Sequence, residues 1–260
     1  MEVLNIVKIG GNIIDDSKSL DSLLQSFSTL EGNKMLIHGG GKIATEIGFR
    51  LGIEPNYVDG RRITDQPTLE LVTMVYGGLI NKNIVARLQK CGCNGIGLSG
   101  ADGGMIKAVK RKVKDVDFGF VGDIASDGIN TAMLSGLLRM GLTPVIAPLS
   151  YSEGVLLNTN ADTIANEVAK AMSSDFSVNL IYCFEQIGVL KELGNPSSLI
   201  KSLDEKGFRI LQSMNAITKG MIPKLENAFS ALHFGVEKVV IGHADHLYEL
   251  INGTKGTSIL

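Results

Sequence analysis

The chain places a lysine beside two glycines at the end of its first apolar segment, a combination that suits the binding of an anion. The segment ends Lys8-Ile9-Gly10-Gly11, and the residues before it are those of a strand buried on both faces. Without a Cβ, Gly10 and Gly11 let backbone N–H groups approach phosphate or carboxylate oxygens. Ligands of open α/β sheets bind at the carboxyl ends of strands. The segment therefore predicts an anion site; a lysine at the sheet edge before a tight turn is the alternative.

A second glycine turn, His38-Gly39-Gly40-Gly41-Lys42, joins another predicted strand to a helix expected near 43–51. The unpaired N–H groups and the positive dipole end of a helix N-terminus favour an anion. A turn that merely requires permissive residues is the alternative. Because the arrangement repeats the one at the end of the first strand, we favour an anion site built from the free N–H groups of this turn.

Three later segments place charged residues near the starts of predicted helices. In Gly60-Arg61-Arg62, an arginine could hold a carboxylate through two parallel hydrogen bonds, or lie in a solvated basic turn. Farther on, Asn160 is a helix cap, and Asp162 falls in the first turn, where it could instead hold a lysine ammonium. Lys224 stands near the positive end of a late helix, which disfavours a structural cation and favours one that meets phosphate.

Alternating strands and helices must position these residues. Runs of Val, Ile and Leu predict strands buried on both faces at 3–9, 34–38, 95–99, 143–148, 180–183 and 238–242. Helical periodicity and capping signals predict helices at 20–27, 67–91, 126–140, 160–172 and 221–234. The alternation indicates an α/β fold around an open, mainly parallel central sheet. Glycine turns between alternating polar and apolar residues predict β-hairpin insertions at 54–63 and 105–124, and a short strand at 155–160.

Composition and charge limit the classes of function. The 260 residues carry a formal net charge of -2, which argues against a nucleic-acid binder. The apolar runs are shorter than the roughly 18 residues of a membrane span, and the N-terminus does not read as a signal peptide, so we expect a cytoplasmic protein without membrane contact. The spacing of the cysteines and histidines predicts no metal site. The G-x-G-x-x-G pattern at 95–100 precedes a strand-like segment instead of a helix, which argues against a dinucleotide site.

Eight motifs follow one another in an order that resembles the N-acetylglutamate kinases of the amino acid kinase family. They are KIGG at 8–11, HGGG at 38–41, GRRIT at 60–64, LSGADGG at 98–104, VDFGFVGD at 116–123, NTNAD at 158–162, KGMIPK at 219–224 and GTSI at 256–259. Each motif alone is loose, but their order is highly specific. The resemblance covers essentially the whole chain.

The resemblance implies transfer of the γ-phosphate of ATP to the side-chain carboxylate of N-acetyl-L-glutamate, a step of arginine biosynthesis. It also implies a three-layer αβα sandwich. An N-terminal lobe, residues 1–175, would bind the acylglutamate and form a dimer, and a C-terminal lobe, residues 176–260, would bind the nucleotide. Lys8 and Lys224 would stabilise the phosphoryl group during transfer, and Asp162 would orient both lysines.

The resemblance also assigns residues to each ligand. The acylglutamate would be held by Gly40, Gly41, Asn158 and, through its α-carboxylate, Arg62. The transferring phosphate and the nucleotide would be held by Gly10, Gly11, Glu185 and Gly188, although the segment 184–190 departs from the family's usual pattern. Mg²⁺ would be bound mainly through the nucleotide phosphates, so no protein ligand of a metal is expected. The start of the first strand by residue 3 implies an arginine-insensitive homodimer, since hexameric members carry an extra N-terminal helix.

The proposed acceptor explains why the sequence shows no acid–base constellation. A carboxylate is already ionised at pH 7, so the reaction needs no general base. Three alternatives stay open: the same reaction on another N-acylglutamate such as N-succinylglutamate, a different small-molecule kinase of the family, and a non-catalytic nucleotide or amino-acid sensor.

Overall fold

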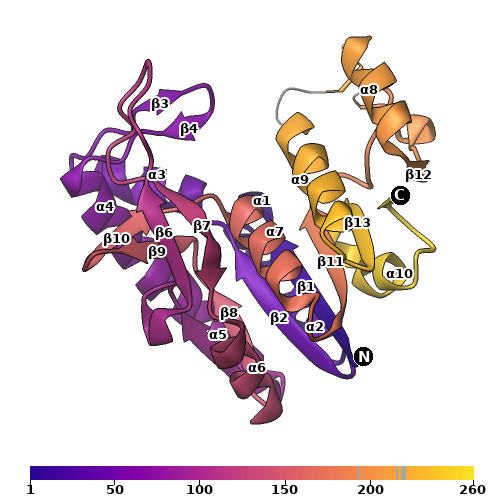
Figure 1. The fold of residues 1–260 in the computed structure, drawn as a ribbon, viewed down its shortest axis with the longest axis horizontal. Coiled ribbons are helices and arrows are strands. Elements are labelled where there is room, and N and C mark those ends of the chain that lie inside the picture. Colours follow the sequence, from indigo (N-terminus) through magenta and orange to yellow (C-terminus); the bar gives the residue numbers. More distant parts are fainter. Residues whose placement is uncertain (193, 215, 218–220) are drawn as a thin grey trace.

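One eight-stranded sheet runs through the molecule (Figure 1). The computed structural model describes residues 1–192, 194–214, 216–217 and 221–260. Across the sheet the strands are β12 (Ser202–Leu203), β14 (Thr257–Ile259), β13 (Lys238–His243), β11 (Ser177–Phe184), β1 (Val3–Ile9), β2 (Asn33–His38), β8 (Thr143–Ile146) and β5 (Gly95–Leu98). The strands from β13 to β5 are parallel, and β14 and β12 run in the opposite direction. The predicted mainly parallel sheet is confirmed.

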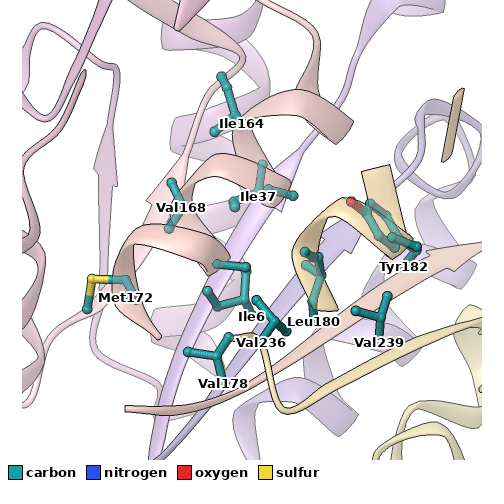
Figure 2. Packing of buried hydrophobic residues seen from close by; sticks show 14 of the residues in the cluster. Ile6, Ile37, Ile164, Val168, Met172, Val178, Leu180, Tyr182, Val236 and Val239 are labelled. Atoms are coloured by element: carbon teal, nitrogen blue, oxygen red, sulfur yellow. The ribbon is translucent and has the colours of Figure 1, made fainter. Parts of the chain in front are cut away.

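Helices cover both faces of the sheet because its strands are apolar on both faces. Ile6 of β1 packs in one hydrophobic cluster, and its neighbour Val7 packs in the other. The first cluster includes side chains of α6 (Thr131–Arg139), α7 (Ala161–Met172), α8 (Glu205–Ser213) and α9 (Ile222–His233). The second includes side chains of α1 (Gly11–Asp15), α2 (Ser17–Ser28), α3 (Gly41–Arg50), α4 (Gln66–Val72), α5 (Asn81–Lys90) and α10 (Leu247–Ile251). Figure 2 shows the first cluster, where Ile164 and Val168 of α7 lie near Ile6 and Ile37. The predicted three-layer sandwich is confirmed.

A second sheet and a small hairpin interrupt the alternation of strands and helices. The second sheet contains β10 (Val155–Asn158), β9 (Leu149–Ser152), β6 (Ile106–Lys110) and β7 (Gly122–Ile129), and the hairpin pairs β3 (Tyr57–Val58) with β4 (Arg61–Arg62). Both lie on the side of the molecule that carries α4 (Figure 1). Thr64 joins the two, since its N–H donates to the carbonyl of Phe118 and its carbonyl accepts from the N–H of Phe120. The predicted hairpins and short strand are confirmed, whereas β9 was not predicted.

The helix predicted at 126–140 is wrong in its first part. Residues 126–129 belong to β7, and α6 begins at Thr131. Asn130 marks the boundary, because its side chain accepts a hydrogen bond of 3.1 Å from the backbone N–H of Met133. Ile129 pairs with Ile106 of β6 and packs against the core from the strand. Cross-strand pairing therefore overrides the local helical pattern.

The helix predicted at 67–91 is not α-helical throughout. It consists of α4, a π-helical segment (Thr73–Ile80) and α5, in direct succession. The side chain of Asp65 caps its start by accepting a hydrogen bond of 3.0 Å from the N–H of Thr68. The π-helical segment contains Gly77 and Gly78, and glycine weakens an α-helix. Such segments are rare and occur frequently at functional sites.

The other predicted strands and helices are confirmed to within three residues at each end. The elements α1, α10, β12 and β14 were not predicted, because each is too short to show a clear period, and the nine-residue α8 was missed as well. The glycines of the G-x-G-x-x-G pattern lie in β5 and in the turn after it, and only a short 3₁₀ turn (Asp102–Gly104) follows. Within the described ranges, every helix is either too short or too polar to cross a bilayer.

Candidate active site

Three charged side chains meet near the carboxyl end of β1. Lys8 belongs to β1, Asp162 to the first turn of α7 and Lys224 to the first turn of α9. Nζ of Lys8 lies 2.6 Å from Oδ1 of Asp162, and Nζ of Lys224 lies 2.6 Å from Oδ2. One carboxylate thus holds two ammonium groups, each on its own oxygen. We call these three residues the lysine–aspartate triad.

Hydrogen bonds with Asn160 and with Tyr182 hold the start of α7, which carries Asp162. The side chain of Asn160 accepts hydrogen bonds from the N–H groups of Asp162 (2.8 Å) and Thr163 (3.1 Å). Tyr182 of β11, which lies beside Lys8 in the sheet, donates its hydroxyl to the backbone carbonyl of Asp162 at 3.4 Å. Both readings of the segment are therefore correct: Asn160 caps the helix, and Asp162 holds ammonium groups.

Burial and mutual charge set the electrostatics of the triad. Burial lowers the pKa of Lys8, the carboxylate of Asp162 opposes this change, and the ammonium of Lys224 adds to it. Burial alone would raise the pKa of Asp162, but Lys8 and Lys224 outweigh burial and hold this pKa well below its usual range. With Asp162 ionised and both lysines protonated, the triad carries one excess positive charge. It is therefore suited to an anion.

The two glycine turns lie side by side at the carboxyl ends of the neighbouring strands β1 and β2. The N–H of Gly10 donates to the carbonyl of Cys183, and the N–H of Gly39 donates to the carbonyl of Ile9, both at 3.1 Å. A Cβ placed on Gly39 would lie 3.5 Å from the nitrogen of Gly11, so the turns are in close contact. Each turn leads into a helix, α1 or α3, whose first N–H groups have no partner within the helix. The predicted turns are thus brought together beside Lys8.

Gly40 occupies a position that only glycine fits. Its φ of 148° lies in a region that residues with a Cβ rarely adopt. A Cβ on Gly40 would also collide with Cδ1 of Ile80 and lie 3.3 Å from the ring of Tyr76. The turn therefore packs directly against the π-helical segment.

Arg62 lies on β4 of the hairpin, and Asn158 lies at the end of β10. Nη2 of Arg62 donates to the carbonyl of Gly41 (2.9 Å) and to Oγ1 of Thr45 (2.7 Å). The guanidinium also stacks over the ring of Tyr57, 4.8 Å from its centroid. Nδ2 of Asn158 donates to Oγ1 of Thr64 at 3.0 Å, two residues after Arg62. These contacts place Arg62, which is 8% exposed, at the start of α3.

Glu185 and Gly188 follow the end of β11, the strand next to β1. Glu185 is exposed, whereas Gly188 is buried with a φ of 152°. A Cβ on Gly188 would approach Oγ1 of Thr257 to 2.7 Å, and this hydroxyl accepts a hydrogen bond from the N–H of Val189. Gly188 thus has a packing role against β14. Neither residue has a hydrogen bond or ion pair with the triad among the described residues.

Several residues around the site were not singled out from the sequence. Thr45 holds Arg62, Thr64 holds Asn158, and Tyr182 holds the start of α7. Thr45 had a usable signal, because it stands one helical turn after Gly41 and its hydroxyl donates to that carbonyl at 2.9 Å. The other two contacts join residues that are far apart in the sequence. Lys219 and Gly220 of the KGMIPK motif lie outside the described residues.

The carboxylate of the triad is not arranged as a metal ligand. Both oxygens of Asp162 face ammonium groups at 2.6 Å. In the part of the chain that the structure describes, no three His, Cys, Asp or Glu side chains gather where they could hold a metal ion.

Comparison with known proteins relates the whole chain to one family. Residues 4–243 match the amino acid kinase family. A curated relative from Cytophaga hutchinsonii named acetylglutamate kinase is 52% identical over 264 residues, which cover 100% of this chain and 99% of the relative. A second acetylglutamate kinase, from Phocaeicola vulgatus, is 52% identical over 259 residues, covering 99% of this chain and 98% of the relative.

A solved structure supports the fold assignment. An N-acetylglutamate synthase from Neisseria gonorrhoeae, complexed with coenzyme A and N-acetyl-glutamate, aligns with a TM-score of 0.83 and 22% identity. The alignment covers 98% of this chain and 59% of the synthase chain. At this identity the likeness extends to the fold alone.

The electrostatics of the triad predict the pH dependence of an Asp162→Asn variant. At pH 7 the variant leaves the buried ammonium of Lys8 and the half-buried ammonium of Lys224 without their counter-charge, and we expect it to lose about 3 kcal/mol of unfolding free energy. Because the folded-state pKa of Asp162 lies below its unfolded value, its carboxylate stabilises the fold above about pH 4 and loses this effect as the pH falls further. The gap between the two proteins should therefore narrow by about 1 kcal/mol or more between pH 6 and pH 3.

Urea unfolding at a series of pH values measures this gap. Asp21→Asn is the matched control, because the Asp21 carboxylate is 62% exposed in its pair with Arg87, and its loss should cost less than about 1 kcal/mol. A gap between wild type and Asp162→Asn that stays constant down to pH 3 would contradict the assignment.

Proposed function

The chain belongs to the amino acid kinase family, and we propose that it is an acetylglutamate kinase. It would phosphorylate the side-chain carboxylate of N-acetyl-L-glutamate with ATP to give N-acetyl-L-glutamyl 5-phosphate, in arginine biosynthesis. One observation carries the proposal: two ammonium groups on one buried carboxylate stand beside two glycine turns at the carboxyl edge of the sheet. Relatives of about half-identical sequence that bear this name over their full length support it.

The proposed chemistry is a direct phosphoryl transfer. An oxygen of the substrate carboxylate attacks the γ-phosphorus, the bond from that phosphorus to the β–γ bridging oxygen breaks, and ADP leaves with the electron pair. No proton moves, because the carboxylate is ionised at pH 7. The barrier is electrostatic, since two anions must meet in line. Lys8 and Lys224 would offset the charge on the transferring group, and the N–H of Gly11 would contact it.

The acylglutamate would lie at the start of α3. The N–H groups of Gly40 and Gly41 would bind one of its anionic groups, and Arg62 would bind its α-carboxylate. Asn158 would contact the substrate from β10. The contacts of Arg62 with Gly41 and Thr45 support this arrangement, because they hold the guanidinium next to the glycine turn.

The nucleotide would lie over the other half of the sheet. We propose that residues 1–175 form the acylglutamate lobe and residues 176–260 the nucleotide lobe, with Gly10, Glu185 and Gly188 on the nucleotide side. The triad supports this division, because Lys224 enters from the second lobe and Lys8 and Asp162 from the first. Mg²⁺, carried by the phosphates, would neutralise their charge. The homodimer and the cytoplasmic location stay predictions.

Trapping of the product tests the function. The acyl phosphate reacts with hydroxylamine to give a hydroxamate, which is measured in the presence of ATP and Mg²⁺. We expect product with N-acetylglutamate and none with unacylated glutamate. N-succinylglutamate and carbamate, run in parallel, identify the alternatives, and calorimetric ATP binding without turnover would indicate a sensor. The proposal fails if no N-acylglutamate yields a hydroxamate.

Removing one ammonium group should slow the chemical step more than it weakens binding. We expect Lys8→Met and Lys224→Met to lower kcat by about 10²- to 10³-fold, because each removes a preorganised charge that acts on the transition state. Methionine retains most of the lysine stem, so the comparison isolates the charge. Lys90→Met on the exposed end of α5 is the control and should leave kcat unchanged. A rise in KM alone would show that the two lysines only bind the ground state.

Loss of the Arg62 guanidinium should weaken the binding of acylglutamate. We expect Arg62→Ala to raise the KM for acylglutamate by about 10- to 100-fold, the range that corresponds to one hydrogen-bonded charge pair. Arg62→Lys should recover only part of this, because an ammonium lacks the forked donor geometry. Arg61→Ala is the matched control, because the side chain of Arg61 is exposed while that of Arg62, the next residue of the same strand, is buried. If the KM for ATP changed instead, the assignment of the two lobes would be reversed.

A further inference from the structure

The glycine turn at the end of β2 rests on one face of the long helix. Ile80 and Tyr76 contact Gly40, and Asn81, the next residue along, contacts His38. In an α-helix of 3.6 residues per turn, side chains five residues apart point about 140° away from each other. The π-helical segment pairs backbone groups five residues apart, so Tyr76 and Asn81 can both face the turn.

A chain of hydrogen bonds from β8 to this glycine turn fixes the orientations of the Asn81 and His38 side chains. Nδ2 of Asn81 lies 2.9 Å from the carbonyl oxygen of Val145, which can only accept, so the nitrogen end of the amide faces β8. The same nitrogen lies 3.1 Å from Nε2 of His38, and its second hydrogen points there. Nε2 therefore accepts and carries no proton.

The orientation of the Asn81 amide determines which nitrogen of the His38 ring carries the proton. In the neutral ring, the proton must lie on Nδ1, which is 2.8 Å from the carbonyl oxygen of Gly39 and donates to it. His38 is fully buried, and burial lowers its pKa to about 4, so the ring is neutral at pH 7. A charged ring would turn an N–H toward the N–H of Asn81.

The held carbonyl determines where the next N–H points. Across a trans peptide the C=O and N–H groups point in opposite directions, so the Gly39 carbonyl turned toward His38 directs the Gly40 N–H away from it. The N–H of Gly39 is itself tied to the carbonyl of Ile9. We propose that His38 and Asn81 are positioning residues that hold the Gly40 N–H in the direction of the acylglutamate. This inference rests on the proposed function, in which Gly40 binds that substrate.

Two amide substitutions separate the two ends of the histidine ring. His38→Asn places an amide nitrogen near the position of Nδ1, so it keeps the donor to Gly39 and loses the contact with Asn81. His38→Gln reaches the position of Nε2, so it keeps the contact with Asn81 and loses the donor to Gly39. The two variants are matched in chemistry and differ in which hydrogen bond survives.

Steady-state kinetics in the hydroxamate assay give the decisive comparison. We expect His38→Gln to lower kcat/KM for acylglutamate by about tenfold or more, the effect of one displaced hydrogen bond to a charged group, with the KM for ATP within about twofold of wild type. His38→Asn should retain more of the activity. Equal kinetics in the two variants, with urea midpoints lowered alike, would mean that the histidine only stabilises the fold and would overturn the inference.

The tautomer is tested without turnover. In wild type labelled with ¹⁵N-histidine, we expect the ring of His38, identified by its absence from the His38→Asn spectrum, to carry its proton on Nδ1 at pH 7. A proton on Nε2, or a charged ring, would overturn the inference while leaving the proposed function intact. Absence of hydroxamate from wild type with every N-acylglutamate would instead overturn the proposed function, and the positioning role with it.

Discussion

Two ammonium groups share one buried carboxylate, and this pairing constrains the structure around it. Burial and the ammonium of Lys224 both disfavour the charge of Lys8, and the carboxylate of Asp162 opposes them by pairing with both lysines. The three side chains come from β1, α9 and α7, which means that the sheet and one helical layer must pack before the charges can meet. The excess positive charge that results has no counter-charge within the triad. An anionic ligand such as a phosphoryl group would supply it.

The backbone contributes the second part of the site, and sheet register explains how. Ile9 pairs with His38 in parallel strands, so β1 and β2 end side by side and the turns that follow them lie in contact. Gly40 is required there, because it combines a positive φ with the close approach of Ile80. A Cβ on Gly39 would make only ordinary van der Waals contact with the neighbouring turn. Part of the unusual glycine content, 31 residues, therefore has a local cause.

Local sequence patterns predicted most of the strands and helices and the charged residues of the site. The features that were missed depend on contacts between residues far apart in the sequence. Lys8 stands out because a charged residue interrupts a strand that is otherwise apolar, and Asp162 stands out because Asn160 marks a helix start. The strand at 126–129 was missed because its partner, β6, lies some twenty residues earlier and decides the pairing. The contact between His38 and Asn81 spans 43 positions and depends on a π-helical segment that the helical pattern of residues 67–91 did not reveal.

The four histidines show what kind of chemistry the site can perform. His38 is neutral, buried and occupied on both ring nitrogens. The other three lie near exposed or half-buried carboxylates of the C-terminal part of the chain, in the pairs His233–Glu205, His243–Asp245 and His246–Glu249. None of the four contacts the triad, so no imidazole is placed to take a proton there. The proposed nucleophile, a carboxylate, has no proton to lose at pH 7. A site that must gather negative charge without moving protons needs fixed cations and oriented N–H groups, and these are what the strand ends supply.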